Sequence, residues 1–275
     1  MKILLTNDDG YFASGVRALQ RIARQHVDDV FLVAPAAEQS GISQAITFLR
    51  PLTAKPVVDR EHSPERIVGY SVNGTPADCV KLGLHELCPW QPDVIISGIN
   101  AGLNVGINVC HSGTVGGAFS AAMFGVPAIA VSLEASRDPD FDAAAKIAWP
   151  IITKVLQHKF QRGTVININI PASATQQDDH HKAVVVPVEL NPLGYQFQKG
   201  TDPKDIPFFW ATNHPAPKPS SFLTDTVAMR DGKITISAIT YDMNCATGME
   251  QLEDAFSSVQ REPADSVGRE SGGRA

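Results

Sequence analysis

The 275-residue chain lacks several features that would assign it to a large class of proteins. It has no run approaching 20 apolar residues, so we expect no membrane span. The apolar stretch at its N-terminus is too short for a signal peptide and turns acidic at once. Lys and Arg (23) are fewer than Asp and Glu (29), and the net charge of −6 argues against binding to nucleic-acid polymers or membrane surfaces. We therefore expect a soluble, cytoplasmic protein.

Cysteine is scarce, and the four thiols show no CxxC spacing: Cys79, Cys88, Cys110 and Cys245. This pattern indicates neither a zinc site nor a disulfide framework, and favours reduced thiols. The chain also has no GxGxxG after a strand and no GxxxxGK[ST], so neither a dinucleotide fold nor a P-loop is supported. An anionic substrate must then be attracted by a local feature, such as a metal ion or a helix N-terminus.

Short apolar runs rich in β-branched residues alternate with helical patterns through the first two-thirds of the chain. The runs are residues 2–6, 30–35, 93–97, 127–132 and 164–170. The helical patterns are residues 14–26, 75–87, 113–124 and 140–157. Runs that are apolar on both faces suit parallel strands covered by helices on either side. The alternation predicts an open, doubly wound, mostly parallel α/β sheet.

After about residue 190 the sequence becomes rich in Pro, Gly and aromatic residues and shows no clear period. We therefore predict an α/β catalytic domain over 1–190. Residues 191–259 would form an extended arm for oligomerisation, with a strand over 233–240 and a short C-terminal helix. The polar, Gly-rich tail 260–275 is predicted to be disordered.

Two adjacent aspartates, Asp8 and Asp9, follow the first strand. Two like charges about 4 Å apart repel by roughly 4 kcal/mol at an effective dielectric near 20, unless a cation lies between them. In open α/β sheets, ligands bind outside the carboxyl ends of the strands. The second strand is followed there by Ser40 and the third by Asn100. These hard oxygen ligands predict a site for a divalent cation of the Mg, Mn or Ca type.

The cation site makes one geometric demand on the chain. Neighbouring side chains in a regular strand point to opposite faces, so both aspartates address one ion only if the chain leaves the pleat. Gly10 permits such a bend. The alternative is that `NDDG` is only a polar strand-to-helix turn, which Asp and Gly favour. The loops with Ser40 and Asn100 favour the metal site over that alternative.

A second candidate site is the segment `HSGTVGG`, where Ser112, Gly113 and Thr114 precede a helix of small residues. Free backbone N–H groups and the helix dipole make such an end an anion site. Ser-Gly-Thr is also an ordinary N-cap. Its place on the same rim favours a phosphate site. Together the two sites indicate metal-assisted hydrolysis of a phosphomonoester, in which Asp8 orients water as a base or attacks directly.

Several long motifs then resemble one family in order and spacing: `TNDDG`, `VAPAAEQSGIS`, `NGTPADCVKLGL`, `PDVIISGINAGLNVG`, `HSGTVGGA` and `NINIP`. They resemble the SurE family of stationary-phase survival proteins, metal-dependent 5′/3′-nucleotidases. The resemblance implies that the metal ligands are Asp8, Asp9, Ser40 and Asn100. It implies that the phosphate contacts are Asn104, Ser112, Gly113 and Thr114. It also implies one divalent cation (Mg or Mn), nucleoside monophosphate substrates and a homodimer or homotetramer. The sequence leaves cleavage of short polyphosphate open.

The chain departs from the family at two positions. His111 stands where tyrosine is usual, and Ala246 stands four residues after Asp242, where some relatives carry a histidine. If that histidine donates a proton, water, His111 or a partner residue must replace it, and an inactive paralogue that binds metal or nucleotide stays an alternative.

Two unrelated families also carry acidic groups after their first strand. A haloacid-dehalogenase-type phosphatase would place Asn7 at the position of its nucleophile, which is chemically wrong. A receiver-like signalling module needs an aspartate at the end of the third strand, where `SGIN` stands.

Overall fold

The computed structural model describes residues 1–275 except 60–62, 177–181, 192–195, 213–219 and 258–275. Met1–Tyr241 forms one compact unit, and the chain from Asp242 onward forms a second, which carries helix α6 (Ala246–Ser257). The predicted disordered tail, 260–275, lies outside the described residues. Over the described part of the chain, no helix has the length and hydropathy that a membrane crossing requires.

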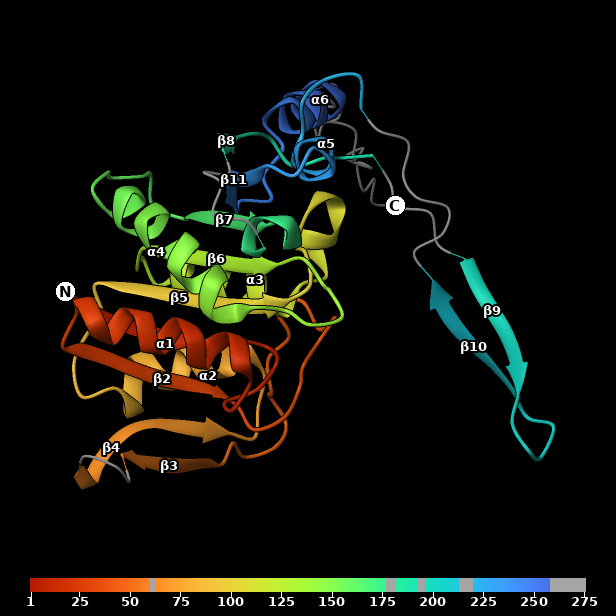
Figure 1. The fold of residues 1–275 in the computed structure, drawn as a ribbon. Helices are drawn as coiled ribbons and strands as arrows, with labels where there is room; N and C mark the ends of the chain where they lie inside the picture. The colour runs from red at the N-terminus through yellow and green to blue at the C-terminus, as the bar shows by residue number, and fades with distance from the viewer. Residues whose placement is uncertain (60–62, 177–181, 192–195, 213–219, 258–275) are drawn as a thin grey trace, which may run out of the picture. The chain divides into compact units, whose positions relative to one another are not determined.

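The first unit is built on a nine-stranded sheet with the order β3-β4-β2-β1-β5-β6-β7-β11-β8 (Figure 1). From β4 across to β7 every neighbouring pair is parallel, whereas β3 and β11 run antiparallel to β4 and β7. The strands are β1 (Lys2–Thr6), β2 (Asp29–Pro35), β3 (Ala54–Asp59), β4 (Ser63–Val72), β5 (Val94–Ala101), β6 (Ala128–Leu133), β7 (Thr164–Ile170), β8 (Ala183–Val185) and β11 (Ile234–Thr240).

Helices cover both faces of this sheet. On one face lie α1 (Ser14–His26) and α4 (Phe141–Leu156), and on the other lie α2 (Pro76–Leu82) and α3 (Gly113–Met123). Along β1, Ile3 and Leu5 join the core under α1 and α4, whereas Leu4 joins the core under α2 and α3. Because successive side chains enter opposite cores, the strand is continuously apolar over residues 3–5. The predicted doubly wound, mostly parallel α/β fold is confirmed.

The helix predicted over 75–87 has two parts. α2 begins after Thr75, whose hydroxyl accepts from the Asp78 N–H while the Asp78 carboxylate accepts from the Thr75 N–H, forming a capping box. A π-helical turn, η1 (Gly83–Leu87), follows. Two short 3₁₀ turns, η2 (Gly106–Cys110) and η3 (Ala172–Thr175), lie in the loops after β5 and β7.

The β3–β4 hairpin is absent from the sequence prediction. Its strands mix prolines and charges with apolar residues, and β3, at the sheet edge, has no buried residue, so neither strand shows a clean period. The sequence places the strand over 233–240 in the arm, but β11 lies in the main sheet, between β7 and β8. The predicted boundary at residue 190 is untested and stays a prediction.

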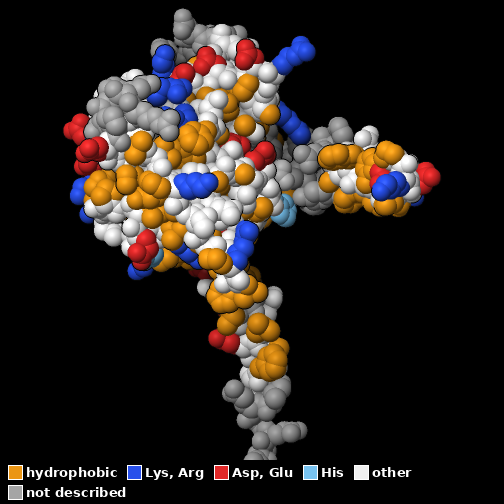
Figure 2. Space-filling view, turned by 90° about the horizontal axis from the view of Figure 1, so that it is seen from below, with side chains coloured by type: hydrophobic (Ala, Val, Ile, Leu, Met, Phe, Trp, Pro, Cys, Tyr) orange, Lys and Arg blue, Asp and Glu red, His pale blue; other side chains and the backbone are white. Residues whose placement is uncertain are grey.

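Within residues 191–241, β9 (Gln196–Thr201) and β10 (Pro207–Thr212) form a separate antiparallel hairpin, and α5 (Asp225–Arg230) precedes β11. Hydrophobic side chains run along the hairpin, the arm at the right of Figure 2. Phe197, Phe209 and Trp210 are each more than 60% exposed. The hairpin therefore leaves aromatic surface uncovered within the single chain.

Candidate functional site

The carboxyl ends of β1 and β5 mark the point where the direction of winding reverses. β1 lies between β2, which follows it through α1, and β5, which the chain reaches later on the other side. Such a switch point is where open α/β sheets bind ligands. The loops that follow β1, β2 and β5 meet there, so three separate sequence segments build one rim.

The loop after β1 leaves the strand as the metal hypothesis requires. β1 ends at Thr6, Asp8 and Asp9 lie in a bend, and Gly10 has a φ of +110°. A side chain at position 10 would be strained at that φ, so glycine permits the turn. The amide of Asn7 donates to the Gly10 carbonyl at 2.9 Å and holds the bend.

The two carboxylates contact different neighbours. The Asp8 Oδ1 accepts from the Thr114 hydroxyl at 2.5 Å, which ties it to the N-terminal turn of α3. The Asp9 Oδ2 accepts from the Ala101 N–H at 3.1 Å, directly after Asn100. Asp8 and Asp9 thus tie the end of β1 to the start of α3 and to the end of β5.

The loop after β2 lies against the same aspartate. The Gln39 N–H donates to the Asp8 carbonyl at 2.7 Å, and the next residue is Ser40. The Ser40 hydroxyl is exposed and donates to the Glu38 carboxylate at 2.8 Å. Sequence reasoning missed Glu38 as a third acid at this rim, although it stands in the same `APAAEQSG` segment. Asn100, half-buried, donates its amide N–H to the Gly102 carbonyl at 2.8 Å.

The N-terminus of α3 packs directly against Asp8. Ser112 is the N-cap, and its Oγ accepts from the Val115 N–H at 3.1 Å. A Cβ on Gly113 would lie 2.8 Å from the Asp8 Cβ and 2.9 Å from its Oδ2, so glycine allows this approach. The Thr114 side chain, predicted to contact phosphate, donates its hydroxyl to Asp8 instead. Its backbone N–H remains part of the helix end, and the phosphate contacts of Ser112–Thr114 stay a prediction.

Asn104 has a different environment from the other predicted residues. It is buried, and its amide donates to the Ser132 hydroxyl at 2.7 Å. Its N–H donates to the Asn169 Oδ1 at 2.8 Å, and its carbonyl accepts from the amides of Asn167 and Asn169. Across the part of the chain that the structure describes, the hydrogen bonds found for Asn104 all run to β6 and β7. Its side chain fastens the loop 101–112 to the sheet, and its phosphate contact stays a prediction.

Burial makes both aspartates unusually hard to ionise. Loss of solvent raises the pKa of Asp8 to about 6, although the Thr114 hydroxyl bond opposes the shift and the Asp9 charge adds to it. Burial also raises the pKa of Asp9, and the charge of Glu38 contributes. A nearby cation would reverse both shifts, because it favours the charged forms.

The donor set fits a hard divalent cation. Two carboxylates, a hydroxyl and an amide oxygen are the ligands that Mg²⁺ and Mn²⁺ prefer. In the described ranges, no group of three or more His, Cys, Asp or Glu side chains is arranged for a metal ion. A cation at this rim would therefore need neutral ligands such as Ser40 and Asn100 beside the two aspartates.

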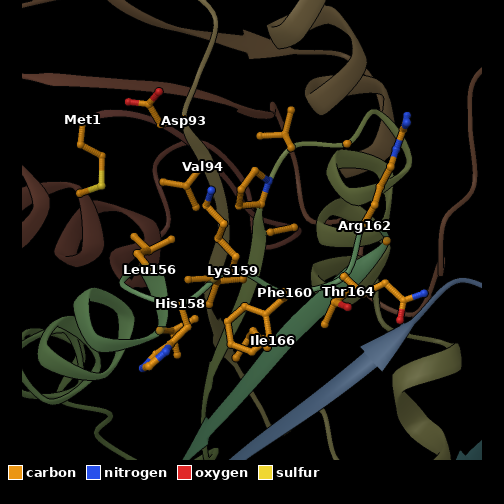
Figure 3. A pocket seen from close by; sticks show the side chains of 18 residues that line it. Met1, Asp93, Val94, Leu156, His158, Lys159, Phe160, Arg162, Thr164 and Ile166 are labelled. Atoms are coloured by element: carbon orange, nitrogen blue, oxygen red, sulfur yellow. The ribbon is translucent and has the colours of Figure 1, made fainter.

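A cavity of about 370 Å³ lies elsewhere, at the amino ends of β5, β6 and β7 (Figure 3). Its lining is mainly apolar and includes Val94 and Leu156, with Lys159 and Arg162 among the polar side chains. None of the predicted site residues is among those that line it. It opens at the end of the strands opposite to the aspartates, so we do not assign the phosphate chemistry to it.

The two positions that differ from the SurE pattern, His111 and Ala246, are far apart in the sequence. His111 is exposed, and its carbonyl accepts from the Ser43 N–H at 2.9 Å, which ties the loop after β2 to the segment before α3. Asp242 and Ala246 belong to the second unit. The described contacts assign no proton donor in place of the missing histidine.

Comparisons with known proteins bear on the chain as a whole. The family model described as "Survival protein SurE" matches residues 3–189. A protein of Rhodopirellula baltica named 5'-nucleotidase SurE is 42% identical over 255 residues, 92% of this chain and 98% of that protein. The 5'-nucleotidase SurE 1 of Thermus thermophilus is 36% identical over 94% of this chain and 99% of its own. A crystal structure of SurE protein from Aquifex aeolicus matches with a TM-score of 0.77 at 31% identity, covering 93% of this chain and 99% of that one.

Proposed function

Since the chain belongs to the SurE family, we propose that it is a metal-dependent phosphomonoester hydrolase of nucleoside 5′- and 3′-monophosphates. The observation that supports this most directly is the convergence of Asp8, Asp9 and the N-terminus of α3 at the switch point of the sheet. One rim thereby offers carboxylates for a cation and N–H groups for a phosphate. We place the enzyme in the cytoplasm.

One divalent cation, Mg or Mn, would be held by Asp8, Asp9, Ser40 and Asn100. When bound, it supplies a Lewis acid and lowers the pKa of a water molecule. Asp8 would orient the attacking water and accept its proton, and the Thr114 hydroxyl holds the Asp8 carboxylate in place.

The remaining phosphate oxygens need a separate set of donors. The backbone N–H groups at Ser112–Thr114 and the dipole of α3, an 11-residue helix, would bind them. Donors fixed in advance stabilise the charge that builds up in the transition state.

The haloacid-dehalogenase alternative is not supported by the local geometry. Asn7 would take the place of its nucleophilic aspartate, but Asn7 is fully buried and its amide braces the bend at Gly10. An amide at that position forms no phosphoaspartate. The family match and the site geometry therefore point to the same chemistry.

Removal of metal is the first test. We expect EDTA to lower phosphate release from nucleoside monophosphates by at least about a hundredfold, because the Lewis acid and its effect on the pKa of the water are lost together. Mg or Mn should restore it. The assay uses 5′- and 3′-monophosphates of all four bases, with tripolyphosphate as a further arm.

A matched pair of variants addresses the ligand set. Ser40→Ala should raise the Mg concentration needed for half-maximal activity, whereas Ser136→Ala, also an exposed serine, should leave it unchanged. Full activity in EDTA would contradict the proposal.

We also propose that the chain assembles as a homodimer or homotetramer through its C-terminal third. The hairpin β9–β10 exposes Phe209 and Trp210, and α6 has no buried residue although Met249, Leu252 and Phe256 lie along one helical stripe. Exposed apolar surfaces of this kind mark protein interfaces. A second copy would cover them.

Light scattering after gel filtration tests the assembly. The double variant Phe209→Ser/Trp210→Ser should shift the molar mass toward that of one chain, because it replaces two exposed aromatic rings of the hairpin. Phe160→Ser, also an exposed ring but outside the arm, should keep the assembly intact. A wild-type protein with the mass of a single chain would refute this part.

A further inference from the structure

The turn that follows the two aspartates leaves one aromatic ring in solvent. In this turn, Gly10–Ala13, Tyr11 is 1% exposed and lies in the core, whereas Phe12 is 72% exposed. Tyr11 and Phe12 are adjacent, yet only the first is used for packing. Burial therefore does not account for an aromatic residue at position 12.

Hydrogen bonds hold the backbone of the turn that carries this ring. The Gly10 carbonyl accepts from the Asn7 amide at 2.9 Å and from the Ala13 N–H at 3.1 Å. The Tyr11 N–H donates to the Pro35 carbonyl at 2.7 Å. The rings of Tyr11 and Phe12 lie edge to face, with centroids 5.0 Å apart. Little backbone freedom is then lost when a ligand covers Phe12.

The Cα of Phe12 is also close to those of the candidate metal ligands. Consecutive Cα atoms are about 3.8 Å apart, so the Cα of Phe12 is within about 11 Å of the Cα of Asp9, and the turn shortens this span. A nucleoside monophosphate joins its base to its phosphate through a ribose. With the phosphate at Asp8 and Asp9, the base must rest on a surface beyond them, along the same rim.

We propose that Phe12 is the stacking surface for the nucleobase of the substrate; this rests on the proposed nucleotidase function. Every base has a π-face, so stacking on an aromatic ring strengthens binding with little preference among bases. The loss expected on truncation to alanine corresponds to roughly 5- to 150-fold per base. Phe12 would thus select nucleotides over other phosphomonoesters without choosing strongly among the four bases.

The test compares a substrate with a base and one without. For Phe12→Ala, the ratio of kcat/KM for adenosine 5′-monophosphate to that for ribose 5-phosphate should fall roughly 5- to 150-fold. The fall should appear in KM, and similar falls are expected for the other three nucleotides. Phe12→Trp should keep the ratio, since it retains an aromatic face. Phe160→Ala, which removes an exposed ring at the opposite end of the strands, should leave the ratio unchanged.

The outcomes separate the two proposals. A wild-type protein that releases phosphate from neither substrate, with Mg or Mn present, overturns the proposed function and this inference together. An active wild type with the same ratio in Phe12→Ala overturns the stacking role alone. If Phe12→Ala instead lowers the molar mass in light scattering and slows both substrates equally, Phe12 is a subunit contact and the inference is wrong.

Discussion

Asp8→Asn is expected to lower phosphate release by at least about a hundredfold and, at the same time, to raise the melting temperature of the metal-free protein. Asp8 is 3% exposed, and burial raises its pKa from 3.8 to about 6. The ionised form is therefore disfavoured in the folded state by on the order of 3 kcal/mol relative to the unfolded chain. An asparagine keeps the acceptor for Thr114 but carries no charge.

The sign of the pH dependence follows from the raised pKa. The folded protein retains a proton on Asp8 that the unfolded chain releases, so the stability given by the neutral carboxyl is lost as the pH rises from about 4 through about 6. Wild type and Asp8→Asn should therefore be equally stable near pH 4. Above pH 6 the variant should melt higher, by up to roughly 10 °C. Thermal unfolding in EDTA across this pH range measures the difference.

Added metal supplies the control for this prediction. Mg or Mn should raise the melting temperature of the wild type, because a ligand that binds only the folded state stabilises it. The same addition should have much less effect on Asp8→Asn. Asp28→Asn, which removes an exposed acid, should behave as wild type in all three measurements. A variant that melts below the wild type at pH 7.5 in EDTA would contradict the view that Asp8 is held at the expense of stability.

Gly113→Ala is expected to disable the site without unfolding the protein. The added Cβ would lie 2.8 Å from the Asp8 Cβ and 2.9 Å from both the Asp8 Oδ2 and the Gln39 carbonyl. Two of these contacts are with the side chain predicted to bind metal, so either that side chain or the helix end must move. A misplacement near 1 Å costs roughly a hundredfold in rate. The measurement is kcat/KM for a nucleoside monophosphate at saturating Mg.

Gly117→Ala is the matched variant, four residues along the same helix. Its Cβ would meet the Ser97 Oγ at 3.2 Å, the Pro76 Cβ at 3.3 Å and the Thr6 Cγ2 at 3.4 Å, tight contacts that do not involve Asp8. Both substitutions replace a helical glycine by alanine, which favours the helix by roughly 1 kcal/mol. Equal losses of activity in the two variants would show that general disturbance of α3, not its approach to Asp8, causes the effect.

The fold could largely be read from the sequence because its central strands are apolar on both faces and alternate with clear helical periods. The strand predicted at 164–170 and the helix at 14–26 agree with β7 and α1 to the residue. The β3–β4 hairpin could not be read in the same way, because an edge strand need not be apolar. The pairing of β11 with β7 also lay beyond the sequence, since two strands more than 60 residues apart meet only in the folded chain.

By itself, the sequence determined that Asp8, Asp9 and Ser40 follow strands of one parallel sheet and that Asn100 lies at the end of another, because strand ends and oxygen ligands are local features. Only the tertiary structure decided how each side chain is used. In the folded chain the Thr114 hydroxyl donates to Asp8, and Asn104 is buried against β6 and β7. The Phe12 ring, by contrast, is exposed to solvent. The physical reason is that hydrogen-bond partners and burial depend on residues distant in sequence, which no local pattern records.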